Sequence, residues 1–370
     1  MKKLVFIILF SFLLALPVAA QDTDYYKEQY EMSGVEEIKQ YIDEDSLDFL
    51  EENGLDPQNP TWVNSLNTKN IFSHIWEFVK SGMRVPVKAG AAILSVILIT
   101  AAITSFGDEQ GRFAPALFAA TLAVAAILSA DVWEAVYVSA KTLKGASYFM
   151  LSFIPVFVGI VSLSGLTVTA ASMGALLIGG AQAVSSVSSF FVLPLMGGYL
   201  SLSVCSTVSP MLSGANIAAT IKKIAFWVLS FITTLFLGIL SIQTAVNSTA
   251  DSLSMRTARF ILGTSVPVAG NVLSEALATI TASMGLLRSS VGIYGVVVMA
   301  VMFLPVIAEL IMWRITMMIT GFAAGFFSLS KISGLLKAVD DMLSLLIGAV
   351  LLVAGMFIIS LAVVITVGKG

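Results

Sequence analysis

Four ionisable side chains interrupt strongly apolar segments in the C-terminal half of the sequence. They are Glu275, Arg288, Glu309 and Arg314. A charge at the centre of a bilayer costs at least about 2.5–3.5 kcal/mol, so such groups normally face the interior of a helix bundle or a water-filled path. The chemistry that they favour is therefore an intramembrane polar path. For the two arginines, the alternative is that the long side chains extend to the lipid headgroups.

Other reactive side chains are scarce. The chain has one cysteine, Cys205, and one histidine, His74, so it predicts neither an intrachain disulfide nor a His/Cys metal centre. The sequence contains no HExxH pattern, no pair of catalytic aspartates and no nucleotide-binding loop. We therefore expect a protein that is not an enzyme, that binds no metal or cofactor, and that needs a separate ATPase for any ATP-driven step.

Prolines and a glycine pair mark the helices that are expected to position the charged groups. Proline inside a helix removes a backbone hydrogen bond and clashes with the preceding turn, and the freed groups need a neighbour or a cavity. Gly321 and Gly325 form a GxxxG pattern, typical of a close helix contact or an oligomer interface. Four prolines in apolar runs are candidate helix breaks: Pro155, Pro194, Pro267 and Pro305.

A small-residue phrase occurs twice. TVTAASMG begins at Thr167 and TITASMG at Thr279, and offsets of 111–112 residues also align the prolines of the two regions. We interpret this as an internal repeat over residues 113–222 and 224–336, of the kind found in transport and channel folds. Chance matching between apolar segments of simple composition is the alternative. Only the second copy holds the four ionisable groups.

The composition predicts the class of fold. Of the 370 residues, 57% are hydrophobic and 12% charged, against roughly 25% charged in ordinary globular domains. Because backbone groups in lipid must bond within their own segment, we predict an all-α, polytopic membrane helix bundle over residues 86–370. Uncharged runs of membrane-spanning length predict about eight crossings, within a range of seven to nine. Two polar stretches, 131–144 and 247–259, are expected to lie between crossings.

The N-terminal part has a different character. Residues 1–20 have the basic start, apolar core and small-residue end of a signal peptide, the alternative being an uncleaved first transmembrane helix. Residues 21–85 predict an acidic, exported, helical region that packs on the membrane part or on a partner; a loosely ordered acidic spacer is the alternative. From Gln21 to Lys80 there are fourteen acidic residues against four lysines, so this region should repel nucleic acid.

One block of residues resembles a known family. Residues 258–295 are similar to the stage III sporulation protein AE family of endospore-forming bacteria, and so is the layout of signal peptide, short exported region and multi-span body. The matching elements are Arg259-Phe260, Gly263, Val266-Pro267, Gly270, Leu273-Ser274-Glu275-Ala276, Leu286-Leu287-Arg288 and Val291-Gly292.

The resemblance implies a function. It implies a non-enzymatic, permease-like subunit of the secretion-like channel complex between mother cell and forespore, which sustains late forespore gene expression. The partners would be other membrane subunits and a separate ATPase. Association with further copies of the same chain, as a homo-oligomer, is also possible in principle. The chain would cross the mother-cell membrane around the forespore, with its N-terminal region in the intermembrane space. The alternative is a secondary transporter that moves a small solute through its own repeat interface.

Overall fold

The computed structural model of the chain describes residues 23–59, 62, 68–105, 113–187, 193–208, 214–265 and 270–366. All regular structure in these ranges is helical, which confirms the predicted all-α class. The elements are α2 (Thr23–Ser33), α3 (Val35–Ile38), η1 (Lys39–Tyr41), α4 (Glu44–Glu52), α5 (Thr68–Thr104), α6 (Ala114–Leu163), α7 (Thr167–Val187), α8 (Leu193–Val208), α9 (Gly214–Ser265), α10 (Gly270–Phe326) and α11 (Ser330–Thr366).

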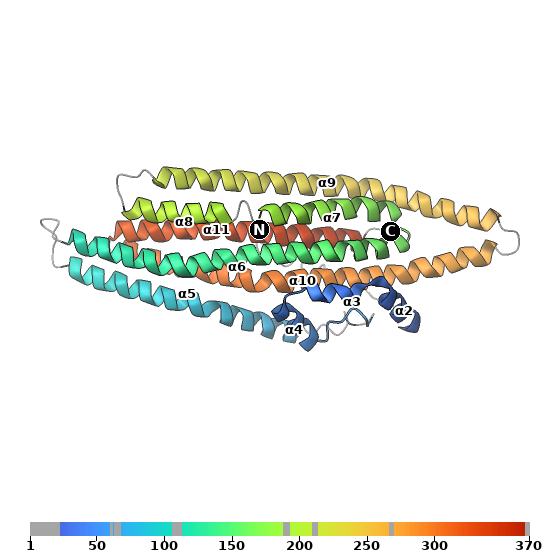
Figure 1. Cartoon of the computed structure of the whole chain (residues 1–370), viewed down its shortest axis with the longest axis horizontal. Helices are drawn as coiled ribbons and strands as arrows, with labels where there is room; N and C mark the ends of the chain where they lie inside the picture. The colour runs from blue at the N-terminus through green and yellow to red at the C-terminus, as the bar shows by residue number, and fades with distance from the viewer. Residues whose placement is uncertain are drawn as a thin grey trace.

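The long helices form one elongated bundle (Figure 1). Helices α7 and α8 lie end to end and together act as one rod, and each rod runs antiparallel to the rod before it in the chain. The short helices α2, α3 and α4 lie on one side of the bundle beside α10, whereas α9 runs along the opposite side. The charged residues of the described bundle lie on α5, α6, α9, α10 and α11, because α7 and α8 contain none.

The number of crossings differs from the prediction. In the described part of the chain, six helices are long and apolar enough to cross a membrane, and Pro194–Cys205 is a shorter apolar helix. The described part thus holds fewer candidate crossings than the eight predicted. The reason is length, because α6, α9 and α10 have 50, 52 and 57 residues. At 1.5 Å per residue these helices are about 75–85 Å long, more than twice the hydrocarbon thickness.

Two stretches that were expected to separate crossings are helical. Residues 131–144 lie in the middle of α6, and residues 247–259 lie within α9. Neither stretch contains glycine or proline, and polar side chains alone do not stop a helix. In α6 the buried residues Val132, Val136 and Leu143 also continue the apolar stripe through the charged stretch.

Two of the four predicted proline breaks are wrong. Pro155 lies inside α6 and Pro305 inside α10, and both helices continue past them. Pro194 is the second residue of α8, in the first turn, where a missing backbone N–H costs nothing. Pro267 lies outside the described residues. A long helix packed on both sides holds the proline in place, so sequence alone overestimates its breaking effect.

Several predicted boundaries fall inside helices. The boundary at residues 85–86 lies within α5, the one between residues 222 and 224 within α9, and the end at 336 within α11. The aligned phrases also have different settings, because Thr167 begins α7 whereas Thr279 lies inside α10. The internal repeat over residues 113–222 and 224–336 stays a prediction. Residues 1–20, predicted as a signal peptide, lie outside the described range.

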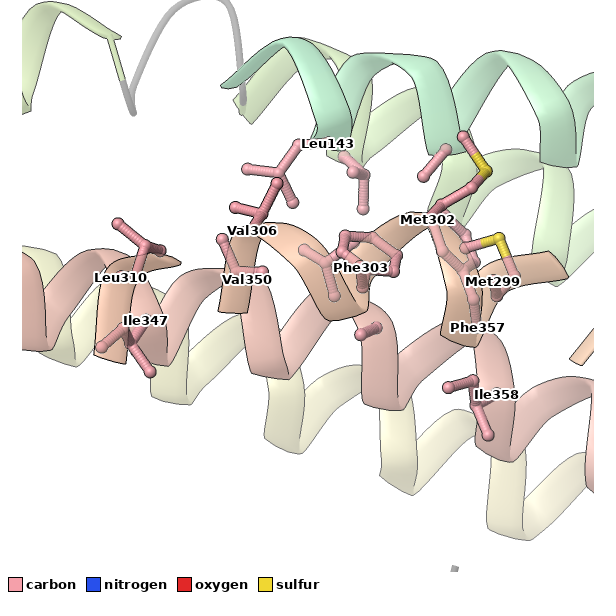
Figure 2. Close-up of a cluster of buried hydrophobic side chains, with 14 of the residues drawn as sticks. Leu143, Met299, Met302, Phe303, Val306, Leu310, Ile347, Val350, Phe357 and Ile358 are labelled. Carbon is pink, nitrogen blue, oxygen red and sulfur yellow. The ribbon is translucent and has the colours of Figure 1, made fainter. Parts of the chain in front are cut away.

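The core lies where α6, α10 and α11 meet. Figure 2 shows Leu143 of α6, Phe303 of α10 and Phe357 of α11 converging in a cluster of aliphatic, aromatic and thioether side chains. A ladder of Phe149, Phe153 and Phe157 on α6 stacks with ring centroids 5.4 and 5.2 Å apart. Such interdigitation fills the space between these three helices with side chains.

Glycines allow α10 to approach this ladder. A Cβ on Gly295 would lie 2.6 Å from Phe153, and one on Gly292 would lie 2.5 Å from Ile365 of α11. Any side chain at either position would have to displace the core. The Val291-Gly292 element of the family-like block therefore has a packing function here.

Candidate functional site

A layer of charged residues crosses the bundle. Arg314 of α10 faces Asp340 of α11, with Nε donating to Oδ1 at 2.8 Å and a second guanidinium nitrogen 3.5 Å from Oδ2. The two side chains are 29% and 21% exposed. This two-point contact neutralises the arginine within the bundle, so Arg314 does not need to extend to a headgroup.

A second ion pair lies beside the first. Lys222 of α9 donates to Asp341 of α11 at 2.5 Å, and the side chains are 40% and 35% exposed. Adjacent carboxylates on α11 thus bind cations on two different helices. Lys222 lies in a continuous helix and makes an interhelical contact.

Glu309 lies near the same layer on the α5 side of the bundle. It is half-buried, and a Cβ on Gly82 of α5 would lie 3.4 Å from the Glu309 backbone. Two turns further on, a Cβ on Gly90 would lie 2.6 Å from Thr316. Glycines on α5 therefore permit the close approach of α10 that half-buries the Glu309 carboxylate.

Arg288 has a different environment. It is 5% exposed, and its nearest acceptor is the carbonyl oxygen of Ile365, 3.5 Å from a guanidinium nitrogen. Ile365 is in the last turn of α11, where carbonyl groups lack partners and the helix dipole is negative. The Nε of Arg288 has no hydrogen-bond partner among the residues that the structure describes. Arg288 thus binds a helix end in place of a carboxylate.

Asp251 was not identified from the sequence as a site residue, yet it is the most completely bonded carboxylate of the bundle. It is 2% exposed and accepts hydrogen bonds from the backbone N–H groups of Val168 and Thr169, at 2.8 and 3.1 Å, and from the Thr169 hydroxyl. One turn earlier, Asn247 donates to the Ser172 hydroxyl. These contacts from α9 cap the first turn of α7, where the dipole favours a negative charge.

The cap gives the polar residues of the first small-residue phrase, TVTAASMG, a structural role. The chain turns from α6 into α7 at Gly165, whose φ of +88° is a conformation that glycine adopts readily. The Leu166 N–H then bonds to the Val161 carbonyl, a pattern that closes helices. Thr169 and Ser172 thus lie where Asp251 and Asn247 can bind them. In the second copy, Ser283 instead donates to Gln29 of α2 at 2.7 Å.

An uncharged zone separates the layer that contains Glu309 and Arg314 from the level of Arg288. On α10 the 20 residues 289–308 separate Arg288 from Glu309, a distance of about 30 Å along a helix. Uncharged runs also cover 145–163 of α6, 224–250 of α9 and 342–366 of α11. About 30 Å is the thickness of the hydrocarbon core of a bilayer. The zone is therefore long enough to span a membrane.

The four candidate path residues do not form one cluster. Arg288 and Glu309 are separated by the whole uncharged zone, and Arg314 binds Asp340 and not Glu309. Glu275 lies on α10, 13 residues or about 20 Å before Arg288; its side chain lies outside the described part. No group of three His, Cys, Asp or Glu side chains within the described ranges could hold a metal ion.

Gly321 and Gly325 lie against α11. Cβ atoms added to them would lie 3.7 Å from Leu336 and Ser333, and the Ser333 hydroxyl donates to the Gly321 carbonyl at 3.4 Å. The GxxxG pattern is thus used within the chain, in the hairpin of α10 and α11.

The acidic N-terminal helices dock on α6 and α10. The Trp62 indole N–H donates to the Ser290 hydroxyl at 2.9 Å, and its ring meets Tyr294 edge to face with centroids 6.2 Å apart. Gly34 lies against Val156 of α6. The region predicted from the sequence over residues 21–85 is therefore packed on the bundle along residues 23–59 and 62.

The docking places tyrosines in buried positions. Tyr26 donates to the Pro57 carbonyl at 2.8 Å, and burial raises the pKa of Tyr26 to about 12. Burial likewise raises the pKa of Tyr30, whose hydroxyl bonds to Glu36. The hydrogen bond from Lys39 lowers the pKa of Glu36. These phenols stay neutral at physiological pH and act as hydrogen-bond donors.

Taken together, the fold and the layers define a polytopic membrane protein built as a helical bundle with an acidic docked N-terminal region. The family model for stage III sporulation protein AE matches residues 63–368. The chain therefore belongs to the stage III sporulation protein AE family, as its sequence motifs indicated. The match covers α5 to α11 and stops short of α2, α3 and α4.

One curated relative agrees with this assignment. Stage III sporulation protein AE of Bacillus subtilis (strain 168) is 23% identical over 306 residues, which cover 81% of this chain and 75% of that protein. No solved structure matches the chain.

Proposed function

We propose that this chain is a non-enzymatic membrane subunit of a secretion-like channel complex that joins mother cell and forespore. The family is one of sporulation proteins, and its match over residues 63–368 is the observation that carries the proposal. In this role the chain works with other membrane subunits and a separate ATPase and supports late forespore gene expression. It lies in the mother-cell membrane around the forespore, with its N-terminal region in the intermembrane space.

The packing of the bundle supports a subunit in preference to a self-contained transporter. Large side chains fill the space between α6, α10 and α11, with Phe149, Phe153 and Phe303 at most 1% exposed. The four ionisable groups do not converge on one solute site. A conduit built with partner subunits is compatible with this packed interior, and the secondary transporter remains the second candidate without a structural feature that favours it.

The direct test is complementation in a sporulating host that lacks its own copy of the gene. The chain should restore a late-forespore reporter and should co-purify with the other membrane subunits. Failure of both, with the protein present and inserted, contradicts the proposal. Uptake of a small solute by proteoliposomes that contain this chain alone would instead support the transporter.

The docked N-terminal helices offer a sharper test of partner binding. Deletion of residues 23–59 removes α2–α4 but leaves α5 intact, so insertion should persist while co-purification of the partners falls. The matched control is Trp62→Phe, which keeps the helices but removes the hydrogen bond to Ser290. Unchanged co-purification of the deletion variant would show that the region has no part in capturing partners.

Glu309→Gln tests the polar path. The substitution keeps the shape of the side chain and removes its charge, so a reduced reporter signal with normal insertion would assign Glu309 to the path. Glu309→Asp serves as the charge-retaining control. A normal spore yield for Glu309→Gln would exclude the carboxylate from the conducting route.

A further inference from the structure

A groove lies between α9 and α11, and the docked N-terminal helices lie on the side of the bundle opposite α9 (Figure 1). The volume of the groove is about 480 Å³, and Lys222 and Lys223 lie at one end. The rest of its wall is mainly apolar and includes Phe226 of α9 and Leu345 and Leu352 of α11. The groove is thus cationic at one end and apolar along the rest of its length.

Both walls change character at the same level. Lys222 binds Asp341, and from that contact onward α9 is uncharged over 224–250 and α11 over 342–366. Both helices are candidate membrane spans. The lysines therefore lie where the charged layer meets an uncharged zone of bilayer thickness, which is the level expected for lipid headgroups.

The charge at this end is not balanced within the chain. Asp341 is paired with Lys222 and Asp340 with Arg314. Lys223 is exposed and forms no ion pair with a described residue, and the same holds for Lys337, one turn before Asp341 on α11. The end of the groove thus carries free positive charge that a phosphate group would neutralise.

The floor of the groove is open. Gly348 of α11 is exposed, and a Cβ built on it would meet no atom within 4 Å. The missing side chain leaves room for a chain of methylene groups between the two helices. Beside the lysines, Trp227 and Phe231 stack with centroids 5.7 Å apart and are 68% and 52% exposed. Exposed aromatic side chains are enriched at membrane interfaces.

We propose that this groove is a binding site for one anionic phospholipid, with its phosphate at Lys222 and Lys223 and one acyl chain along Phe226, Leu345, Gly348 and Leu352. Basic pockets between membrane helices bind anionic headgroups in this way. A zwitterionic lipid fits less well, because its own cation would meet the unpaired lysine. The proposal does not depend on the sporulation function.

The test uses the full chain, stripped of lipid and offered equal amounts of phosphatidylglycerol and phosphatidylcholine with identical acyl chains. Bound lipid is counted by native mass spectrometry. The wild type should retain phosphatidylglycerol preferentially. Lys223→Gln should lower this preference about fivefold, the factor expected for one basic residue near a headgroup. The matched control is Lys141→Gln on α6, an exposed lysine outside the groove.

A second variant tests the acyl seat independently. Gly348→Leu fills the floor and should weaken binding of both lipids on the order of tenfold, as expected when about two methylene groups lose their burial. Gly334→Leu is its control, because Gly334 is an exposed glycine on the same helix with open space around it and outside the groove. Both positions face outward, so both variants should fold, which melting temperatures verify.

Three results would overturn the proposal. One is equal retention of the two lipids by the wild type. Another is wild-type binding by both Lys223→Gln and Gly348→Leu. The last is displacement of the lipid by soluble glycerol phosphate at comparable concentration, since that would show that the acyl groove contributes nothing.

Discussion

The two ends of the uncharged zone hold their charges in different ways. At one end, Arg314 meets Asp340 and Lys222 meets Asp341, so side chains of opposite sign neutralise one another between helices. At the other end, Arg288 faces the C-terminal turn of α11 and Asp251 caps the N-terminus of α7. Here single charges are matched with the partial charges of helix ends.

This difference predicts which charges matter for stability. A cap that satisfies several buried N–H groups leaves all of them unpaired when it is removed. An ion pair that is about one-third exposed is replaced in part by water. Loss of the Asp251 cap should therefore destabilise the protein more than loss of either ion pair. Loss of Arg288, which is poorly bonded, should not.

Asp251→Ala should have the largest effect. It would leave the N–H groups of Val168 and Thr169 and the Thr169 hydroxyl without their acceptor, at a cost of about 3 kcal/mol. Thermal unfolding of the purified protein in nanodiscs measures the loss. Asp251→Asn, which keeps one acceptor oxygen, is the control and should lose less. Equal stability of the alanine variant and the wild type would refute the role of the cap.

Arg314→Met should cost less, about 1–2 kcal/mol, because water reaches both members of the pair with Asp340. A double-mutant cycle with Asp340→Leu separates the pair from the rest of the site. We expect the double variant to lose less stability than the sum of the losses of the two single variants. Strict additivity would mean that the two-point contact contributes nothing.

Arg288→Met should have a small effect of opposite sign. It removes a buried cation that has one long hydrogen bond and an unpartnered Nε, so stability should stay equal or rise by about 1 kcal/mol. Loss of reporter activity without loss of stability would then assign Arg288 to function. Strong destabilisation would show that the α11 terminus depends on this cation.

Lys222→Met is the smallest change, at most about 1 kcal/mol, because its ion pair with Asp341 is the more exposed of the two. Added salt screens the exposed pair in the wild type, so the thermal midpoint of Lys222→Met should depend less on salt than that of the wild type. A cost above that of Arg314→Met would reverse the ranking of the two pairs and show that exposure does not control their strength.

The sequence identified the class of the fold better than its details. The deficit of charge correctly predicted a helical membrane bundle, and the block 258–295 led to the right family. Residues 131–144 and 247–259 were expected to separate crossings because they are polar, although neither contains glycine or proline and residues 131–144 continue a buried stripe of α6. Local polarity was given too much weight against helix propensity and packing.

Site residues were predicted with the same limits. Glu309 and Arg314 were identified because charge in an apolar run is costly. The residues that they contact were not predicted. Asp340-Asp341, the acidic pair that binds two helices, was visible as two adjacent carboxylates in an apolar region. Asp251 gave no such signal, because it lies in a polar stretch and its partners at Val168 and Thr169 are more than 80 residues away.

Composition and spacing along the chain determine that this protein is helical, lipid-embedded and related to the sporulation family, because apolar length and residue order are properties of the sequence itself. Which charge meets which partner was decided only by the tertiary structure. Pairing depends on how far each rod is shifted along its neighbour, and that shift follows from side-chain packing between helices, such as Gly295 against Phe153 and Gly82 against Glu309.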